Sequence, residues 1–138
     1  MTILPDVIPR LSLPLLEIDP QATQLQLRAY PDGHFYRAHM DAPANAMAVR
    51  RAINFVYYFH RMPRAYTGCE LVLFDSNIEA DAYTRAHFTR VVPDDNSIIF
   101  FPSPYYHSVL PVVCPSKELA DGRFAINGHF LRREPTAS

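Results

Sequence analysis

Cysteine is scarce and tryptophan is absent in this sequence, which has two cysteines, Cys69 and Cys114. The cysteines form no CxxC pair, so neither a zinc knuckle nor a disulfide framework is indicated, and we expect buried free thiols. Charge of one sign is also lacking, because 13 Lys and Arg stand against 14 Asp and Glu and form no cluster beyond a few pairs. A nucleic-acid partner is therefore not expected.

Long hydrophobic runs are absent as well, since no apolar stretch approaches the roughly 18 residues of a membrane span. The first residues lack a basic region followed by an apolar stretch and a cleavage site, which excludes a recognisable secretory signal. We therefore expect a soluble protein without a membrane partner, located in the cytoplasm. A length of 138 residues is typical of one globular domain.

Glycine is scarce, with four residues, whereas 13 prolines divide the chain into short segments rich in β-branched and aromatic residues. Such segments are typical of strands. The predicted strands are residues 24–30, 34–40, 51–59, 69–74, 87–92, 97–101, 106–113 and 123–131. About eight short strands in one domain predict an all-β fold with few or no helices, built as a jelly roll of two packed sheets.

The connections between these strands give further expectations. Pro31-Asp32-Gly33 predicts a tight turn and a hairpin between the first two strands, because Pro presets φ and Gly permits positive φ. Residues 75–86 are predicted to form a polar loop with one helical turn, and residues 42–50 a second connection. Four prolines in residues 1–23 predict an extended N-terminal arm. The folded domain is expected over residues 24–132, followed by a tail at 133–138.

His39 and Asp41 stand two residues apart, so in an extended chain both side chains project to one face and can contact one metal ion. Taken alone, such a pair is more typical of a protein surface. Farther along, His107 and then Arg123 each begin a predicted strand. Two imidazoles and one carboxylate bind Fe(II) on one side and leave three coordination positions open. Arg123 is a suitable counterion for a 2-oxo acid, because guanidinium makes paired hydrogen bonds and stays charged when buried.

Several short motifs follow one another in a fixed order. They are YPDGHFY at 30–36, HMD at 39–41, RAINFVYY at 51–58, YTGCEL at 66–71, FFP at 100–102, HSVLPV at 107–112 and RFAIN at 123–127. From about Leu25 to Leu131 the chain thereby resembles the Fe(II)/2-oxoglutarate oxygenases, specifically their prolyl 4-hydroxylase-like branch. The order of all the motifs is far more specific than any one of them.

What the resemblance implies is a double-stranded β-helix in which His39, Asp41 and His107 bind Fe(II) and Arg123 forms a salt bridge with 2-oxoglutarate. The implied cofactors are Fe(II) and 2-oxoglutarate, with ascorbate as an optional addition. Asp41 argues against halogenation, because related iron halogenases replace this carboxylate with a small residue. The stretch after Arg123 does not reproduce the Arg and Asn spacing of the nucleic-acid demethylases.

The resemblance also assigns roles to two tyrosines. Tyr58 would place its hydroxyl against the carboxylate that Arg123 holds, with Tyr57 as the alternative. Tyr30 would point at the co-substrate from the first strand, with Tyr36 as the alternative. Asn54 shares a face with Tyr58, so it can contact the bound cofactors. The alternatives are a satisfied polar group of the core and an indirect support of the site.

Three further residues lie near these positions. Asn127 and His129 share a face with Arg123 by strand parity, and His129 is expected to line the pocket without binding metal. Cys69 stands where the family commonly has glycine, and we expect it to be packed rather than catalytic.

Two kinds of substrate remain open within the hydroxylases. The resemblance favours a prolyl residue or a proline-like substrate, and the alternative is a free amino acid or other small metabolite. A non-catalytic cupin-type metal-binding protein is a third hypothesis. Because relatives usually carry helices that cover one sheet, and 23 proline-broken residues cannot supply them, we expect a homodimer.

Overall fold

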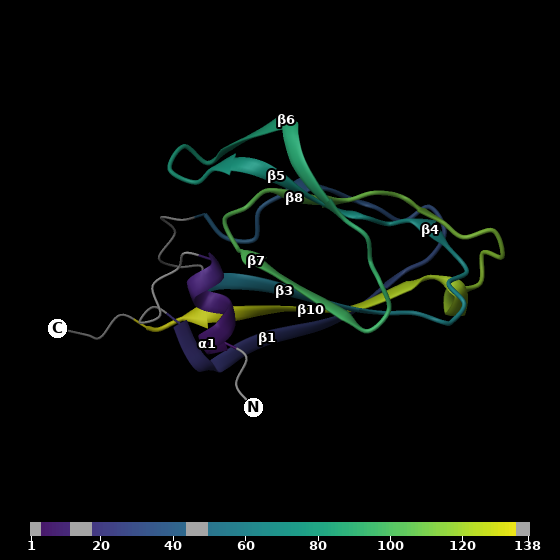
Figure 1. The fold of residues 1–138 in the computed structure, drawn as a ribbon, viewed down its shortest axis with the longest axis horizontal. Helices are drawn as coiled ribbons and strands as arrows, with labels where there is room; N and C mark the ends of the chain where they lie inside the picture. The colour runs from purple at the N-terminus through teal and green to yellow at the C-terminus, as the bar shows by residue number, and fades with distance from the viewer. Residues whose placement is uncertain (1–3, 12–17, 44–49, 135–138) are drawn as a thin grey trace.

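Two four-stranded antiparallel sheets face each other as two layers (Figure 1). The computed structural model describes residues 4–11, 18–43 and 50–134. The strands are β1 Ile18–Tyr30, β2 Tyr36–His39, β3 Arg51–Phe59, β4 Thr67–Gly68, β5 Leu71–Asn77, β6 Ala82–Val91, β7 Ser97–Pro102, β8 His107–Val109, β9 Val112–Val113 and β10 Arg123–Arg132. The helical elements are the single turns α1 Leu4–Val7, η1 Ile8–Leu11 and η3 Leu119–Asp121. The predicted all-β jelly roll is confirmed, with ten strands among the described residues rather than eight.

The two sheets differ in strand length. The first sheet has the order β1-β10-β3-β7 and contains the long strands, and the second has the order β2-β8-β5-β6, while β4 and β9 form a separate two-stranded ribbon. In the first sheet Tyr30 pairs with Arg123, and Ala125 pairs with both Arg28 and Tyr58. In the second sheet His39 pairs with His107. These pairings set the residues that face the space between the layers.

The predicted hairpin between the first two strands is wrong, although its turn is present. Gly33 has a φ of 77°, and the His34 N–H donates a 3.1 Å hydrogen bond to the Pro31 carbonyl. However, β1 pairs with β10 and β2 pairs with β8, so the turn carries the chain from one sheet to the other. A local turn signal fixes the backbone at the corner but does not choose the partner of either strand.

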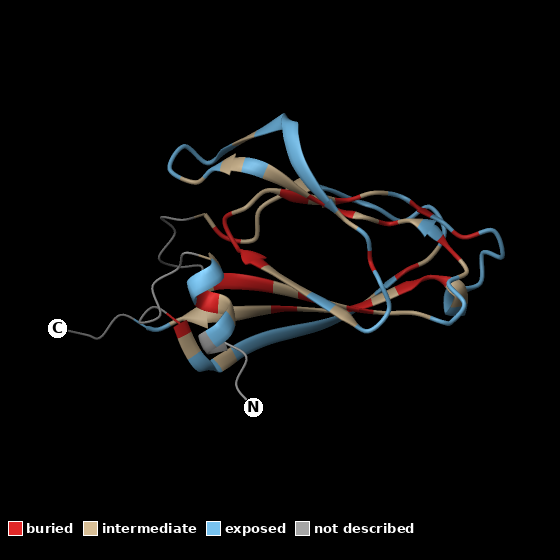
Figure 2. Ribbon diagram, in the orientation of Figure 1, coloured by how far each residue is buried: buried red, intermediate tan, exposed pale blue. Residues whose placement is uncertain are grey.

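The loop predicted for residues 75–86 is wrong too, because β5 and β6 form a hairpin there. The Ala80 N–H donates to Asn77 Oδ1, and Asp81 takes a φ of 47° at the turn. β6 is the largely exposed edge strand of the second sheet (Figure 2), so the polar composition of this stretch resembles that of a loop.

Of the connection predicted at 42–50, residues 44–49 lie outside the described residues. In the predicted N-terminal arm, α1 and η1 are helical turns and β1 already begins at Ile18.

Apolar side chains gather in two clusters. The larger one lies between the sheets and includes Tyr58, Cys69, Phe101 and Val112. The smaller one packs Ile8 of η1 against Ile53 on the outer face of the first sheet. On β1 of the same sheet Leu25 and Leu27 remain 67% and 69% exposed, so the helical turns cover only part of the outer face. None of the helices among the described residues is long and apolar enough to cross a membrane.

Candidate active site

A cavity of about 170 Å³ opens between the two sheets. Histidines from the second sheet and Asp41 line one end of it, and Arg123, Tyr30 and Tyr58 from the first sheet line the other. The residues predicted to bind metal and those predicted to bind a carboxylate therefore share one cavity.

The side chains of His39, Asp41 and His107 converge, with one ligand atom from each lying within 4.8 Å of the others. His39 Nε2 lies 3.5 Å from Asp41 Oδ1, and His107 Nε2 lies 3.4 Å from Asp41 Oδ2. The pairing of β2 with β8 sets the two imidazoles opposite each other, and the chain continues directly from β2 to Asp41. Two imidazole nitrogens and a carboxylate are a donor set that suits Fe(II).

The backbone fixes the tautomer of both rings. His39 Nδ1 lies 2.8 Å from the Arg37 carbonyl, and His107 Nδ1 lies 3.0 Å from the Tyr105 carbonyl. Because a carbonyl can only accept, each Nδ1 carries the proton and donates it, and each Nε2 directs its lone pair toward Asp41 when the ring is neutral. This arrangement is the one that metal-binding histidines use, so the residues present fit a divalent metal.

Burial and charge act against each other at this end of the cavity. Burial is the largest influence on the pKa of Asp41 and raises it, but the hydrogen bond with His39 and the nearby histidines outweigh burial and lower the pKa to about 2. Burial lowers the pKa of His107. For His39 the lowering effect of burial is outweighed by its hydrogen bonds to Asp41 and Arg37, and the pKa is raised. Asp41 is therefore a carboxylate at neutral pH.

Asn54 holds Asp41 in place. Its Nδ2 donates to Asp41 Oδ2, while its Oδ1 accepts from Ser103 Oγ at 2.6 Å and from His129 Nδ1 at 2.7 Å. Since a carboxylate can only accept, this contact also fixes the orientation of the amide. Burial lowers the pKa of His129 to about 4, so its ring is neutral and does not repel a metal ion.

The structure places the Asn54 amide against Asp41, a contact of the kind that an indirect support of the site would make. His129 lines the cavity as expected, and its ring lies in the same hydrogen-bonded group. Ser103 was missed, because nothing in the sequence singles out one serine between two prolines.

Arg123 lies at the other end and is 2% exposed. Its Nε–H donates a 2.9 Å hydrogen bond to Cys69 Sγ, and its guanidinium carbon lies 4.0 Å from the ring centroid of Tyr30 and 5.1 Å from that of Tyr58. Its Nη1 is buried and has no hydrogen-bond partner. In the described part of the chain no carboxylate lies within ion-pair distance of Arg123. A buried guanidinium without an anion is unfavourable, so this end of the cavity fits the carboxylate of a ligand.

Within each pair of alternative tyrosines, the two residues differ in burial. Tyr58 is 2% exposed and lines the cavity, whereas the Tyr57 hydroxyl donates to Asn96 Oδ1 outside it. Tyr30 and Tyr36 both line the cavity, but Tyr36 is 44% exposed and its ring lies 4.4 Å from that of His39. Burial raises the pKa of both Tyr30 and Tyr58, so their hydroxyls stay protonated and can donate hydrogen bonds.

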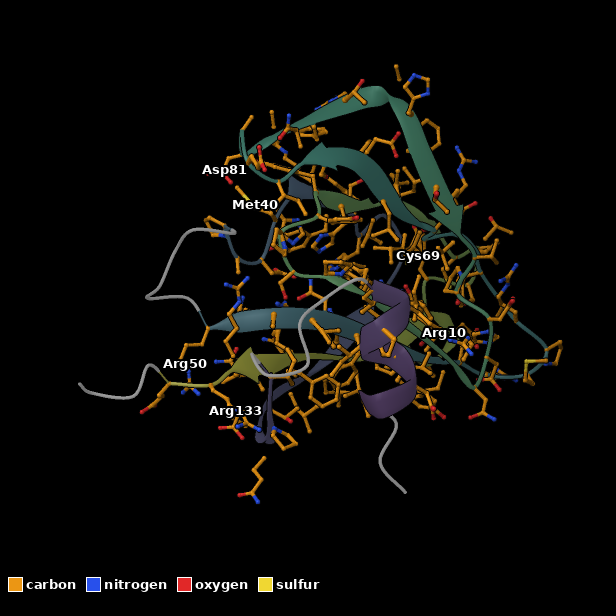
Figure 3. All side chains as sticks on the ribbon, turned by 60° about the vertical axis from the view of Figure 1, so that its left-hand side comes forward. Arg10, Met40, Arg50, Cys69, Asp81 and Arg133 are labelled. Atoms are coloured by element: carbon orange, nitrogen blue, oxygen red, sulfur yellow. The ribbon has the colours of Figure 1, made fainter. Side chains whose placement is uncertain are left out.

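Both cysteines are buried and free, as predicted. Cys69, labelled between the two sheets in Figure 3, has a φ of 62° and is fully buried. Burial is the largest influence on its pKa and raises it, so the thiol is protonated at neutral pH.

Arg28 was missed by sequence reasoning. It lines the cavity, and its Nε is buried without a hydrogen-bond partner. Strand parity with Tyr30, two residues later, is the signal that could have found it. Arg51 and Asn127 also line the cavity, and Arg51 Nη1 lies 3.9 Å from Asp41 Oδ1.

Comparison with known sequences gives the family. The family model described as the 2OG-Fe(II) oxygenase superfamily matches residues 25–131. An uncharacterized PKHD-type hydroxylase of Synechocystis sp. is 41% identical over 131 residues, which are 94% of this chain and 42% of the relative.

Comparison with solved structures agrees. A prolyl-4-hydroxylase of Pseudomonas putida superimposes with a TM-score of 0.59 and 25% identity, over 86% of this chain and 56% of the other. A structure of prolyl 4-hydroxylases from Phytophthora capsici gives a TM-score of 0.55 at 19% identity, over 96% of this chain and 40% of the other, and supports the fold alone. The chain therefore spans about half the length of these relatives.

Proposed function

The chain belongs to the 2OG-Fe(II) oxygenase superfamily, and we propose that it is an Fe(II)- and 2-oxoglutarate-dependent dioxygenase that hydroxylates a C–H bond. One observation carries the proposal. A single cavity has a His-Asp-His donor set at one end and, at the other, a buried arginine that forms no ion pair with a carboxylate of the described residues. A metal-chelating dicarboxylate is complementary to both ends.

His39, Asp41 and His107 would hold the iron. The two backbone carbonyls keep the Nε2 lone pairs directed inward, and Asn54 keeps a carboxylate oxygen of Asp41 in position. When bound, Fe(II) and 2-oxoglutarate supply the electrons and the oxygen activation for hydroxylation.

Arg123 would bind the distal carboxylate of 2-oxoglutarate. The guanidinium still has its Nη1 donor to offer, and the Tyr30 and Tyr58 rings shield it from water. The protonated hydroxyls of the two tyrosines are further donors for the same anion. Phe101, Val56 and Leu71 are apolar residues of the cavity lining.

A prolyl residue or a proline-like compound is the proposed substrate. The likeness to the Pseudomonas putida prolyl-4-hydroxylase supports it. A free amino acid or small metabolite is the alternative. Mass spectrometry on a peptide panel and on free amino acids separates the two, because only one set should gain the mass of an oxygen atom.

Anaerobic mixing with Fe(II) and 2-oxoglutarate tests the function itself. A metal-to-ligand absorption band is expected for the wild type and should be lost in Asp41→Ala and His107→Ala. Asp75→Ala is the matched control, because Asp75 is exposed on β5, and it should keep the band. In air, succinate should form from 2-oxoglutarate. Metal binding without the band and without succinate would instead identify a cupin-type binding protein.

We also propose a homodimer formed through the outer face of the first sheet. Leu25, Leu27 and Ile98 are exposed on strands of this sheet, and burying them would be favourable. A monomeric mass in light scattering would contradict this.

A further inference from the structure

We propose that the substrate carries a carboxylate and that Arg28 binds it, so that the enzyme acts on a free amino or imino acid rather than on an internal residue of a peptide. The inference rests on the proposed function, since it names the substrate class of the same cavity.

The charges that line the cavity do not balance. Three arginines, Arg28, Arg51 and Arg123, face one carboxylate, Asp41, and with neutral histidines two positive charges remain. Binding Fe(II) together with the dianion 2-oxoglutarate adds equal and opposite charge, so the excess is unchanged. A neutral peptide segment would leave this excess uncompensated, whereas an anionic substrate reduces it.

Two of the three arginines already have an interaction partner, observed or proposed. Arg123 lies at the end proposed for the distal carboxylate of 2-oxoglutarate. Arg51 Nη1 lies 3.9 Å from Asp41 Oδ1, and its Nε–H donates a 2.9 Å hydrogen bond to Gln24 Oε1. Arg28 makes no hydrogen bond or ion pair with any described residue, and its Nε is buried without a partner. A buried donor on a charged group calls for an acceptor.

Arg28 lies between the two ends of the cavity. Its partner on β10 is Ala125, whose side chain offers the guanidinium no hydrogen-bond acceptor. Arg28 shares the inner face of β1 with Tyr30, two residues later, and lines the cavity together with Tyr30 and His39. A carboxylate bound here would be held beside the metal, where a substrate must lie.

Asn127 supplies the complementary group. Asn127 lines the same cavity, and its Oδ1 is a buried acceptor without a partner. On β1 it pairs with Gln26, which precedes Arg28 by two residues on the inner face. A carboxylate with an adjacent N–H satisfies both orphaned atoms at once. That pair of groups is what a free amino or imino acid presents, and an internal peptide residue lacks its carboxylate.

The test compares each of a set of L-amino acids, L-proline included, with its own carboxamide. Binding is measured by calorimetry on full-length protein loaded with Mn(II) and N-oxalylglycine, which replace iron and 2-oxoglutarate without turnover and keep the probes away from Arg123. At least one acid should bind more tightly than its amide. Arg28→Gln should weaken that acid by about 10- to 100-fold and leave the amide unchanged. Arg90→Gln, which removes an exposed arginine of β6, is the matched control and should change neither.

Several outcomes would overturn the proposal. It fails if no acid is preferred over its amide, or if Arg28→Gln weakens acid and amide equally. It fails also if Arg28→Gln instead loses N-oxalylglycine, because Arg28 would then belong to the co-substrate. If glycyl-L-proline binds more tightly than every free acid, the carboxylate is a peptide terminus and the free-acid assignment is wrong. Succinate formation by the wild type without substrate is scored separately, so failure of the proposed function is recognised on its own.

Discussion

The two ends of the cavity are built in opposite ways. At the His39–Asp41–His107 end, each side chain is held by another protein group, through backbone carbonyls or through Asn54. At the Arg123 end, a buried charge has one sulfur acceptor and two aromatic rings, and one of its nitrogens has no partner. Metal ligands must be oriented before the ion binds, whereas an anion site needs a hydrogen-bond donor that no protein group already occupies.

The largest effect is expected from a substitution that impairs only the Arg123 end of the cavity. Arg123→Met should weaken 2-oxoglutarate binding by at least about 100-fold, because the charge-assisted hydrogen bonding to the distal carboxylate is lost. Mn(II) affinity should not change. Since the substitution removes an unsatisfied buried charge, the free energy of unfolding of the ligand-free protein should be equal or higher. Calorimetry with each ligand and urea denaturation measure these quantities.

Arg90→Met is the control for the general loss of an arginine, because Arg90 is exposed. A parallel loss of Mn(II) binding in Arg123→Met, or a large drop in stability, would mean that the arginine is structural and that the two ends are not independent.

A smaller effect is expected when the first end loses its support. Asn54→Ala should lower Mn(II) affinity by about 10- to 100-fold, because Asp41 loses the donor that positions it. Asn54→Asp should be worse, since it sets a second carboxylate against Asp41. In metal-saturated protein, N-oxalylglycine should bind either variant as it binds the wild type. If it binds more weakly there, Asn54 contacts the co-substrate directly.

Relations between residues close in the sequence could be predicted from the sequence, whereas pairings between distant segments could not. His39 and Asp41 could be paired by strand parity, because both lie in one short segment. That His107 lies opposite His39 depends on the pairing of β2 with β8, which only the motif order suggested. The hairpin at Pro31–Gly33 failed for the converse reason, since a correct local turn says nothing about partners far along the chain.

Arg28 and Ser103 mark the limit of sequence reasoning here. Arg28 shares the parity of Tyr30, yet an arginine in an edge strand is ordinarily solvated, and only the cavity shows that its Nε lacks a partner. Ser103 acts through Asn54, a contact between β3 and the residue after β7 that no local pattern encodes. Orphaned and shared polar groups belong to the packed structure rather than to the sequence pattern.

The smallest effect concerns Cys69, which positions Arg123. In Cys69→Ala the Nε–H loses its acceptor, so 2-oxoglutarate affinity should fall about fivefold, the equivalent of one hydrogen bond of ~1 kcal/mol, while Mn(II) affinity stays the same. Cys69→Ser keeps an acceptor and should restore most of the affinity, which a purely space-filling role would not predict. Equal affinity in the Ala and Ser variants would contradict the positioning role.

Cys69→Gly separates the side chain from the backbone. At a φ of 62° any residue with a Cβ is strained by about 1 kcal/mol or more, and glycine is not. The Gly variant should therefore bind 2-oxoglutarate as weakly as the Ala variant but resist urea better than it does. Such a result would mean that Cys69 lowers the stability of the protein through its positive φ. In return, its sulfur is the hydrogen-bond acceptor that positions Arg123.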